Sequence, residues 1–142
     1  MLGGADLLDK QINVYSLDTG NFYDGKESHL HWMNHKLRSE RNILVNGGNI
    51  KGSDGRIKKT IVGTKEMESM FSKFGIGKDE LSSIAKGEYD FSSYGDESKK
   101  LSSLGEKYRN AKNLVSMKNE RIKKTKNELL TLLSNKVEAN IQ

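Results

Sequence analysis

The sequence predicts a mostly α-helical protein of the α+β class, with a small β-hairpin, an αα-hairpin and a long C-terminal helix of coiled-coil type. A heptad row of apolar residues near the C-terminus predicts the long helix. Turn dipeptides between short apolar runs near the middle predict the β-hairpin. Two short amphipathic segments separated by glycines predict the αα-hairpin.

The N-terminal third predicts one helix preceded by local structure. The apolar residues between positions 5 and 17 show no clean period, so a short helix and a short strand both remain open. Residues 18–21, Asp-Thr-Gly-Asn, and the pair Asp24-Gly25 predict turns. Ser28 is placed to cap a helix that runs to about residue 42. The apolar row of this helix consists of Leu30, Met33 and Leu37.

Residues 42–64 change to a β-type sequence. The run Ile43-Leu44-Val45 predicts one strand, and residues 57–62 predict another. Between them lie Asn46-Gly47 and Asp54-Gly55, dipeptides that adopt positive φ in tight hairpin turns. We therefore expect a β-hairpin with one solvated face.

Two short helices are expected next. Residues 64–74 predict a helix capped by Thr64, with two glutamates in its first turn, where the helix dipole favours negative charge. The glycines at 75–77 interrupt it. Residues 79–86 predict a second helix that stops at Gly87, the residue type best suited to a helix C-terminus.

The clearest signal is a heptad repeat that follows a loop rich in aromatic residues at positions 88–96. The repeat predicts one helix over about residues 97–137, or ~60 Å at about 1.5 Å per residue. Gly105 is the one helix-breaking residue of this window. Row a reads Leu101, Tyr108, Val115, Ile122 and Leu129, and row d reads Leu104, Ala111, Lys118, Thr125 and Leu132.

The expected organisation is a mixed helical and β-hairpin region at residues 1–95, followed by a basic amphipathic helix at residues 96–142. Hydrophobic residues make up 34% of the chain, which is enough for one core. The formal net charge is +5, and residues 96–142 carry 11 basic against 6 acidic groups. This excess predicts an acidic partner such as nucleic acid, although basic residues also serve to solvate a helix surface.

The residue usage predicts a cytoplasmic protein. Cysteine is absent, which excludes disulfides, thiolate metal sites and cysteine nucleophiles. No run approaches ~18 apolar residues, so we expect neither a signal peptide nor a membrane partner. Lys outnumbers Arg 19 to 5 and proline is absent, a bias typical of low-GC bacteria, their phages and plasmids.

The histidines give little support to a metal site. Glu27, His31 and His35 are spaced for one helical face, and two histidines one turn apart occur among zinc ligands on helices. Trp32, however, stands where that zinc motif has its general base. We therefore expect no metal and no cofactor, and we interpret the histidines as structural or surface residues.

No catalytic pattern is present, and the chain is not expected to be an enzyme. Lys78 is followed by Asp79 where a phosphate-binding loop needs Ser or Thr. No Gly-x-Ser-x-Gly turn occurs. Residues 67–85 have the apolar spacing of a helix-turn-helix, but Phe71 is bulky where the two helices must approach, which favours an ordinary αα-hairpin.

The long helix predicts the function. Eight basic residues and one acid, Glu120, lie between Lys107 and Lys126, and spaced cations of this kind suit a phosphate backbone. The expected function is therefore binding of nucleic acid or of a nucleoprotein complex. The predicted contacts are Arg109, Lys112, Lys123, Lys124 and Lys126 in the helix and Arg56, Lys58 and Lys59 in the hairpin.

The alternative is a protein-protein interaction module, such as a phage or mobile-element inhibitor of a host enzyme. Its contact surface would be the apolar seam of the long helix. A helix of ~60 Å extends beyond a compact domain of ~30 Å, so part of the seam is expected to lie uncovered and to form a homodimer. The predicted partner-binding residues are Leu101, Leu104, Tyr108, Val115, Ile122 and Leu129.

Overall fold

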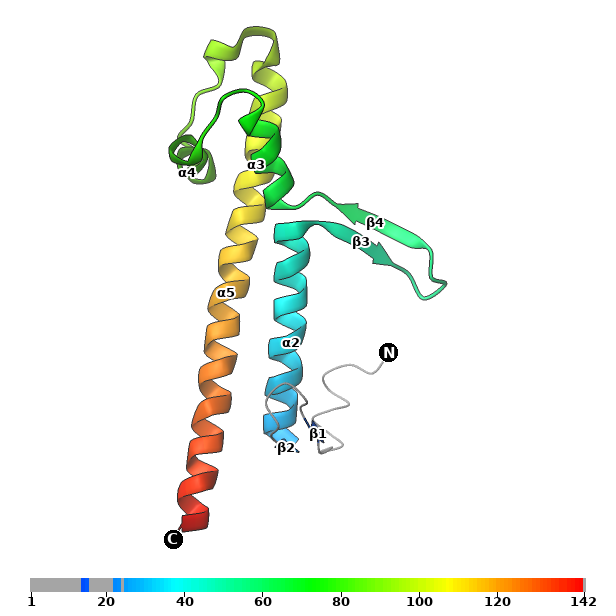
Figure 1. The fold of residues 1–142 in the computed structure, drawn as a ribbon, viewed down its shortest axis with the longest axis vertical. Coiled ribbons are helices and arrows are strands. Elements are labelled where there is room, and N and C mark those ends of the chain that lie inside the picture. Colours follow the sequence, from blue (N-terminus) through cyan, green and yellow to red (C-terminus); the bar gives the residue numbers. More distant parts are fainter. Residues whose placement is uncertain (1–13, 16–21, 24, 142) are drawn as a thin grey trace. The chain divides into compact units, whose positions relative to one another are not determined.

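The computed structural model confirms a mostly helical α+β protein with a β-hairpin and a long C-terminal helix. It describes the backbone of residues 14–15, 22–23 and 25–141, and the side chains of residues 25–136 (Figure 1). In chain order the elements are β1 (Val14–Tyr15), β2 (Phe22–Tyr23), α2 (Gly25–Asn46), β3 (Gly48–Lys51), β4 (Ile57–Ile61), α3 (Thr64–Ser72), α4 (Lys78–Lys86), the 3-10 helix η1 (Ser92–Glu97) and α5 (Ser98–Ile141).

The chain divides into two compact units. Unit 1 comprises residues 1–39 and 118–142, and unit 2 comprises residues 40–117. Both borders run through helices, since α2 and α5 each contribute residues to both units. The division expected at residue 95 rested on composition and secondary structure, whereas these units follow from contacts in space.

In unit 1, α2 and α5 form an antiparallel helix pair (Figure 1). Leu30 of α2 packs with Leu129 of α5, and Leu132 and Leu133 extend this cluster. One turn further along α2, Asn34 Oδ1 lies 3.3 Å from Thr125 Oγ. The short strands β1 and β2 also belong to this unit and pair antiparallel, with Val14 opposite Tyr23.

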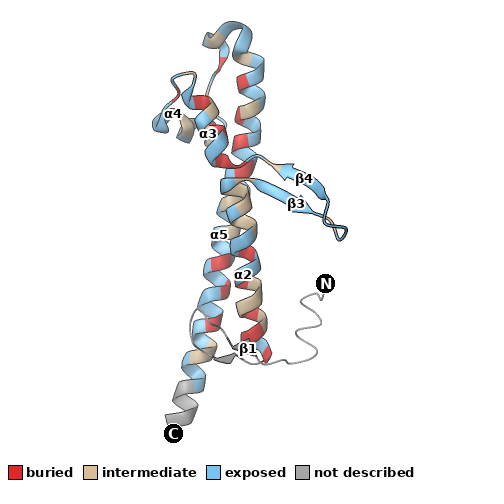
Figure 2. Ribbon diagram, turned by 45° about the vertical axis from the view of Figure 1, so that its right-hand side comes forward, coloured by how far each residue is buried: buried red, intermediate tan, exposed pale blue. Residues whose placement is uncertain are grey.

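Unit 2 has an aromatic core between α3, α4 and α5. Phe71 is 0% exposed, and its ring meets Tyr108 edge-on at 5.9 Å and stacks on Phe91 at 6.0 Å. Gly105 allows this packing, because a Cβ at that position would lie 2.9 Å from the Phe91 ring. Buried residues recur at intervals along α5 (Figure 2), as the heptad repeat predicts.

The expected strand at residues 43–45 is wrong, because Ile43, Leu44 and Val45 belong to α2. The helix stops at Gly47, whose φ is +77° and whose N–H donates to the Ile43 carbonyl at 2.7 Å. The hairpin therefore begins only at β3. Strands β3 and β4 pair antiparallel, with Ile50 opposite Lys59, Lys51 opposite Ile57 and a bulge between these two pairs.

The two short helices and the second strand are confirmed with small shifts, but both predicted helix caps are wrong. Helix α2 begins at Gly25, so Ser28 lies inside the helix instead of capping it. Helix α3 starts at Thr64, but its N-cap position is Gly63, which offers no side chain for capping. Helix α4 ends at Gly87 in the left-handed conformation, as expected. The 88–96 loop is held by ring contacts, including the Tyr89 and Phe91 rings at 4.8 Å, and its second half forms η1. The turn expected at 18–21 and most of the apolar segment at 5–17 fall outside the described residues.

Candidate nucleic-acid interface

The apolar seam of α5 packs inside each unit. Leu101 and Tyr108 are buried in the core of unit 2, and Leu104 lies half-buried against it. Ile122 and Leu129, which were expected to lie uncovered, are only 8% and 7% exposed. The six predicted partner-binding residues therefore face the protein interior wholly or in part, Val115 also being half-buried. The homodimer stays a prediction, but the uncovered row that suggested it is not found.

The basic residues predicted to bind nucleic acid lie outside the apolar seam and are exposed. All eight predicted nucleic-acid contacts are exposed, and within residues 25–136 none of them forms an ion pair. These residues are Arg109, Lys112, Lys123, Lys124 and Lys126 of α5 and Arg56, Lys58 and Lys59 of the hairpin. With the seam buried, these basic residues meet the solvent, as do three apolar residues of α5, Leu114, Met117 and Leu130, which are 46%, 58% and 53% exposed.

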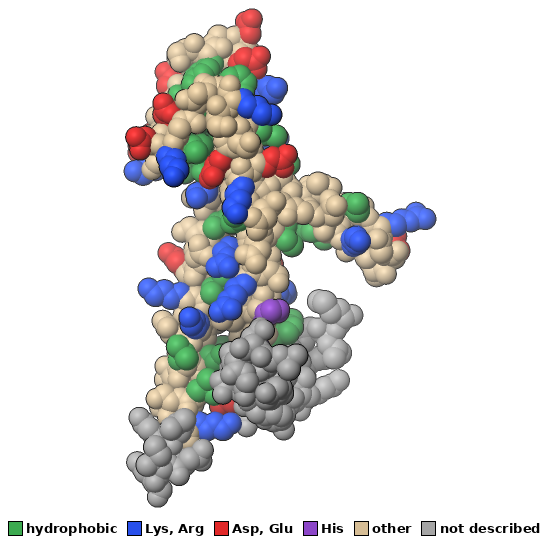
Figure 3. Space-filling view, in the orientation of Figure 1, with side chains coloured by type: hydrophobic (Ala, Val, Ile, Leu, Met, Phe, Trp, Pro, Cys, Tyr) green, Lys and Arg blue, Asp and Glu red, His purple; other side chains and the backbone are tan. Residues whose placement is uncertain are grey.

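The described side chains of unit 1 carry an excess of basic groups. These side chains, at residues 25–39 and 118–136, include nine Lys or Arg and three Asp or Glu. On the face drawn in Figure 3, blue side chains gather along the α5 stretch of this unit. Sequence reasoning missed the three cations of α2, Lys26, Lys36 and Arg38, because their segment was counted together with four acids that precede residue 25.

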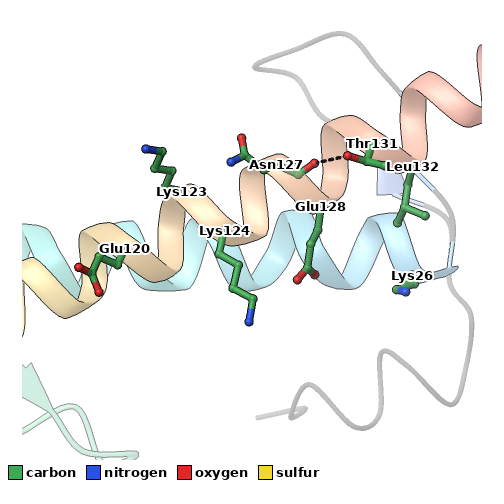
Figure 4. A pocket seen from close by; sticks show the side chains of 8 residues that line it. All are labelled: Lys26, Glu120, Lys123, Lys124, Asn127, Glu128, Thr131 and Leu132. Atoms are coloured by element: carbon green, nitrogen blue, oxygen red, sulfur yellow. Dashed lines mark hydrogen bonds between the residues drawn. The ribbon is translucent and has the colours of Figure 1, made fainter.

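Lys123 and Lys124 differ in the charges that surround them. Glu120, Lys124 and Glu128 are spaced four residues apart on α5, and Figure 4 shows them on the same side of the helix. Lys123 points to another side, together with Asn127 (Figure 4). Lys124 thus has a carboxylate one turn away in each direction, so it attracts an external phosphate less strongly than Lys123 does.

A groove of about 750 Å³ lies beside these residues in unit 1 (Figure 4). Its walls carry both signs of charge, and the Thr131 hydroxyl donates to the Asn127 carbonyl at 2.9 Å instead of facing a ligand. A groove with mixed charge does not select an anion. The lining residues are Lys26, Glu120, Lys123, Lys124, Asn127, Glu128, Thr131 and Leu132.

Arg109 in unit 2 has a structural contact in addition to its exposure. Its guanidinium lies against Gly87, where an added Cβ would come within 2.6 Å of a guanidinium nitrogen. Gly87 ends α4, and the C-terminus of a helix carries partial negative charge that attracts a cation. Replacing Arg109 therefore perturbs α4 as well as any contact with a ligand.

The titratable side chains with shifted pKa values serve the core of unit 2. The pKa of Tyr108 is raised by burial and by the hydrogen bond that its hydroxyl donates to Glu68 Oε2 at 2.7 Å. A hydrogen bond with Tyr94 and burial raise the pKa of Tyr89 to about 12. Both phenols stay protonated at neutral pH, which suits packing and not proton transfer.

The histidines lie on α2 without a metal-binding arrangement. Among the side chains of residues 25–136, no three His, Asp or Glu groups are placed to hold a metal ion. His29 stacks on Trp32 at 6.0 Å between ring centroids, and the Lys36 amine lies 5.2 Å from the Trp32 ring centroid. The absence of a metal and of a cofactor stays a prediction.

Of the helices in the described residues, none is both long and apolar enough to cross a membrane. No known protein family, no curated protein and no solved structure matches this chain, so the proposals below rest on its own geometry and charge.

Proposed function

We propose that the protein binds nucleic acid through the exposed basic face of α5, by contacts with the phosphate backbone. The observation that carries this proposal is the inward packing of the α5 seam, which leaves lysines and arginines on the solvent side of the helix. Contacts of this kind are electrostatic and do not depend on base sequence. The cytoplasm, the compartment expected from the sequence, would bring this face to RNA, to bacterial DNA and to their protein complexes.

The geometry of Lys123 supports phosphate contact over a structural role. Lys123 is exposed, and it points away from the side that carries Glu120 and Glu128. Lys126 and Lys112 are exposed as well and have no ion-pair partner among the described residues. A lysine that neutralises no neighbouring carboxylate keeps its full attraction for a phosphate group.

The test is binding of the full chain to a generic DNA duplex across a salt series. The variant Lys112→Gln, Lys123→Gln, Lys126→Gln removes three exposed cations of α5 and leaves Arg109 on Gly87. We expect weaker binding to all sequences alike. The slope of log K against log salt should be smaller by about 0.9 for each phosphate that the variant no longer neutralises.

A matched control removes the same charge elsewhere. Lys73, Lys78 and Lys99 are exposed residues of unit 2 that lie outside the predicted contacts, and their triple change to Gln alters the net charge equally. We expect the control to keep both affinity and slope close to those of the wild type. Equally weakened binding in the two variants would mean that net charge alone attracts the ligand, and unchanged binding in both would refute the α5 surface.

The alternative function, a protein-binding module that acts through the α5 seam, gains no support from the burial of that seam. A host-enzyme inhibitor using this surface would first have to open the cores of both units.

A further inference from the structure

The β3–β4 hairpin is an arm with no covered face. Every residue of β3 is exposed, and in β4 only Ile61, at the root of the arm, is partly covered. Figures 1 and 2 show the hairpin extending away from α3. A two-stranded sheet in a folded domain normally buries one face against a helix or another sheet, since an isolated hairpin is marginally stable. An arm exposed on both faces is therefore suited to contact something outside the unit.

The arm is cationic near its tip. Between Lys51 and Lys59 the chain has four basic residues, the others being Arg56 and Lys58, against one acid, Asp54. The Asp54 carboxylate accepts a hydrogen bond from the Arg56 N–H at 3.0 Å, so it is engaged in shaping the turn. Figure 3 shows Lys and Arg side chains at the end of this arm. The charge complements a polyanion.

Apolar and basic side chains are neighbours on the arm. Ile50 is opposite Lys59 and Lys51 is opposite Ile57, with a bulge between these two pairs. Ile50 and Ile57 are 38% and 57% exposed, which leaves apolar surface in water. An arm that combines exposed cationic and apolar side chains suits a ligand that offers both phosphates and apolar groups, as duplex DNA does.

The dimensions match one groove of duplex DNA. Two paired strands lie about 4.8 Å apart, which is less than the width of the B-DNA major groove, about 12 Å. A strand of five residues extends about 17 Å, which exceeds the depth of that groove, about 8.5 Å. That groove admits a two-stranded β-ribbon, whereas the major groove of duplex RNA is too narrow for side chains to read. The arm therefore has the width to enter and the length to reach base edges with its root outside.

We infer that the β3–β4 hairpin inserts into the major groove of duplex DNA. This inference rests on the proposed function and adds the kind of nucleic acid and the groove. Lys58 and Lys59 contact phosphates, and Arg56 at the turn reaches base edges, where Arg most often recognises guanine. Ile57 beside it offers an apolar contact for thymine methyl groups.

The open edges of the arm raise the other option, a protein strand added to β3 or β4. Lysines on exposed edges disfavour such pairing. The arm carries Lys51 on β3 and Lys58 and Lys59 on β4, so both edges have this protection. Duplex DNA therefore fits the arm better than an added protein strand does.

The experiment measures fluorescence anisotropy of a labelled 20-bp DNA duplex and of the RNA duplex of the same sequence, with the full chain at low salt. We compare wild type, the hairpin variant Arg56→Gln, Lys58→Gln, Lys59→Gln, and the control Lys73→Gln, Lys78→Gln, Lys99→Gln. We expect wild type to prefer DNA over RNA. The hairpin variant should bind DNA about tenfold more weakly or worse, since each phosphate contact adds to the counterion release that drives binding. The control should stay within about twofold of wild type, because it removes the same charge but leaves the arm intact.

Competition then identifies the groove. Methyl green, which occupies the major groove, should displace wild type from DNA, and netropsin, which occupies the minor groove, should not. Displacement by netropsin alone, equal affinity for DNA and RNA, or an unaffected hairpin variant would overturn the inference while leaving the proposed function intact. If wild type binds neither duplex at low salt, the proposed function fails and this inference fails with it, and the arm is then left for a protein partner.

Discussion

Single residues show how the interior of each unit accommodates polar groups. Thr125 occupies a d position of the apolar seam, where it is 8% exposed and faces Asn34. Its Oγ also lies 3.0 Å from the Arg121 carbonyl oxygen, so the hydroxyl has an acceptor within its own helix. Tyr108 in unit 2 is 2% exposed and donates to Glu68. The buried hydroxyl of Thr125 thus has an acceptor in its own helix, whereas that of Tyr108 is satisfied by a residue far away in the sequence.

Tyr108→Phe tests this satisfaction through its pH dependence. At pH 8 we expect the variant to lose about 1 to 2 kcal/mol in free energy of unfolding, because the hydrogen bond to a carboxylate is removed. The pKa of Tyr108 is raised in the folded state above the ordinary value of 10.0, so its contribution is complete below pH 10 and is lost as the pH rises further. At pH 11 the difference between wild type and variant should therefore shrink by about 1.4 kcal/mol.

Urea unfolding at the two pH values measures this difference. Titration of lysines affects both proteins alike and cancels in the comparison. A difference that is the same at pH 8 and pH 11 would contradict a stabilising, protonated Tyr108 in the folded state.

At the scale of elements, the hairpin is held at its root by two glycines in close contact. A Cβ on Gly63 would lie 2.4 Å from both the Gly47 nitrogen and the Val45 carbonyl oxygen. Gly47 itself has a φ of +77°, which a residue with a side chain rarely adopts. The end of α2 and the start of α3 thus meet backbone to backbone. This contact fixes the two ends of the chain segment that forms the hairpin.

Gly63→Ala should therefore destabilise unit 2 by about 2 kcal/mol or more, because the added methyl meets backbone atoms that have no room to move. Gly55→Ala at the tip is the matched control. Its φ is +79° but the space around it is open, so we expect only the conformational cost of about 1 kcal/mol. Thermal unfolding followed by far-UV circular dichroism compares the two, and a larger destabilisation at Gly55 would contradict the root contact.

At the scale of the whole molecule, two units share two helices. Seam residues of α5 up to Ala111 belong to the aromatic core of unit 2, and those from Ile122 onward pack in unit 1. The single tryptophan of the chain, Trp32, lies in unit 1. Its fluorescence therefore reports on the unfolding of that unit.

Ile122→Asp should lower the stability of unit 1 by about 3 kcal/mol or more, since it places a carboxylate without a partner at a position that is 8% exposed. Asn127→Asp, an exposed change of equal charge in the same unit, should stay within about 0.5 kcal/mol. Urea unfolding monitored by Trp32 fluorescence measures both. Sedimentation equilibrium gives the outcome that would contradict this prediction. If wild type sediments as a dimer of two 16.0 kDa chains, and Ile122→Asp sediments as a monomer with an unchanged unfolding curve, the seam is a dimer interface.

Features that depend on neighbours within a few residues were determined by the sequence alone. The heptad row places α5 to within a few residues, and Gly87 ends α4, because helix contacts and caps link positions three to five apart. The sequence alone also determined that all eight predicted basic contacts are exposed, since Lys and Arg avoid burial unless they are paired.

Only the tertiary structure decided what covers the seam and which segments form the hairpin. Asn34 and Thr125 are 91 positions apart, and nothing in one chain's sequence marks them as neighbours. Ile43 to Val45 have high β propensity, yet they extend α2 in a half-buried setting, where context outweighs propensity. The same long-range packing turned a predicted partner surface into interior, because apolar side chains are buried by whichever surface of the folded chain reaches them.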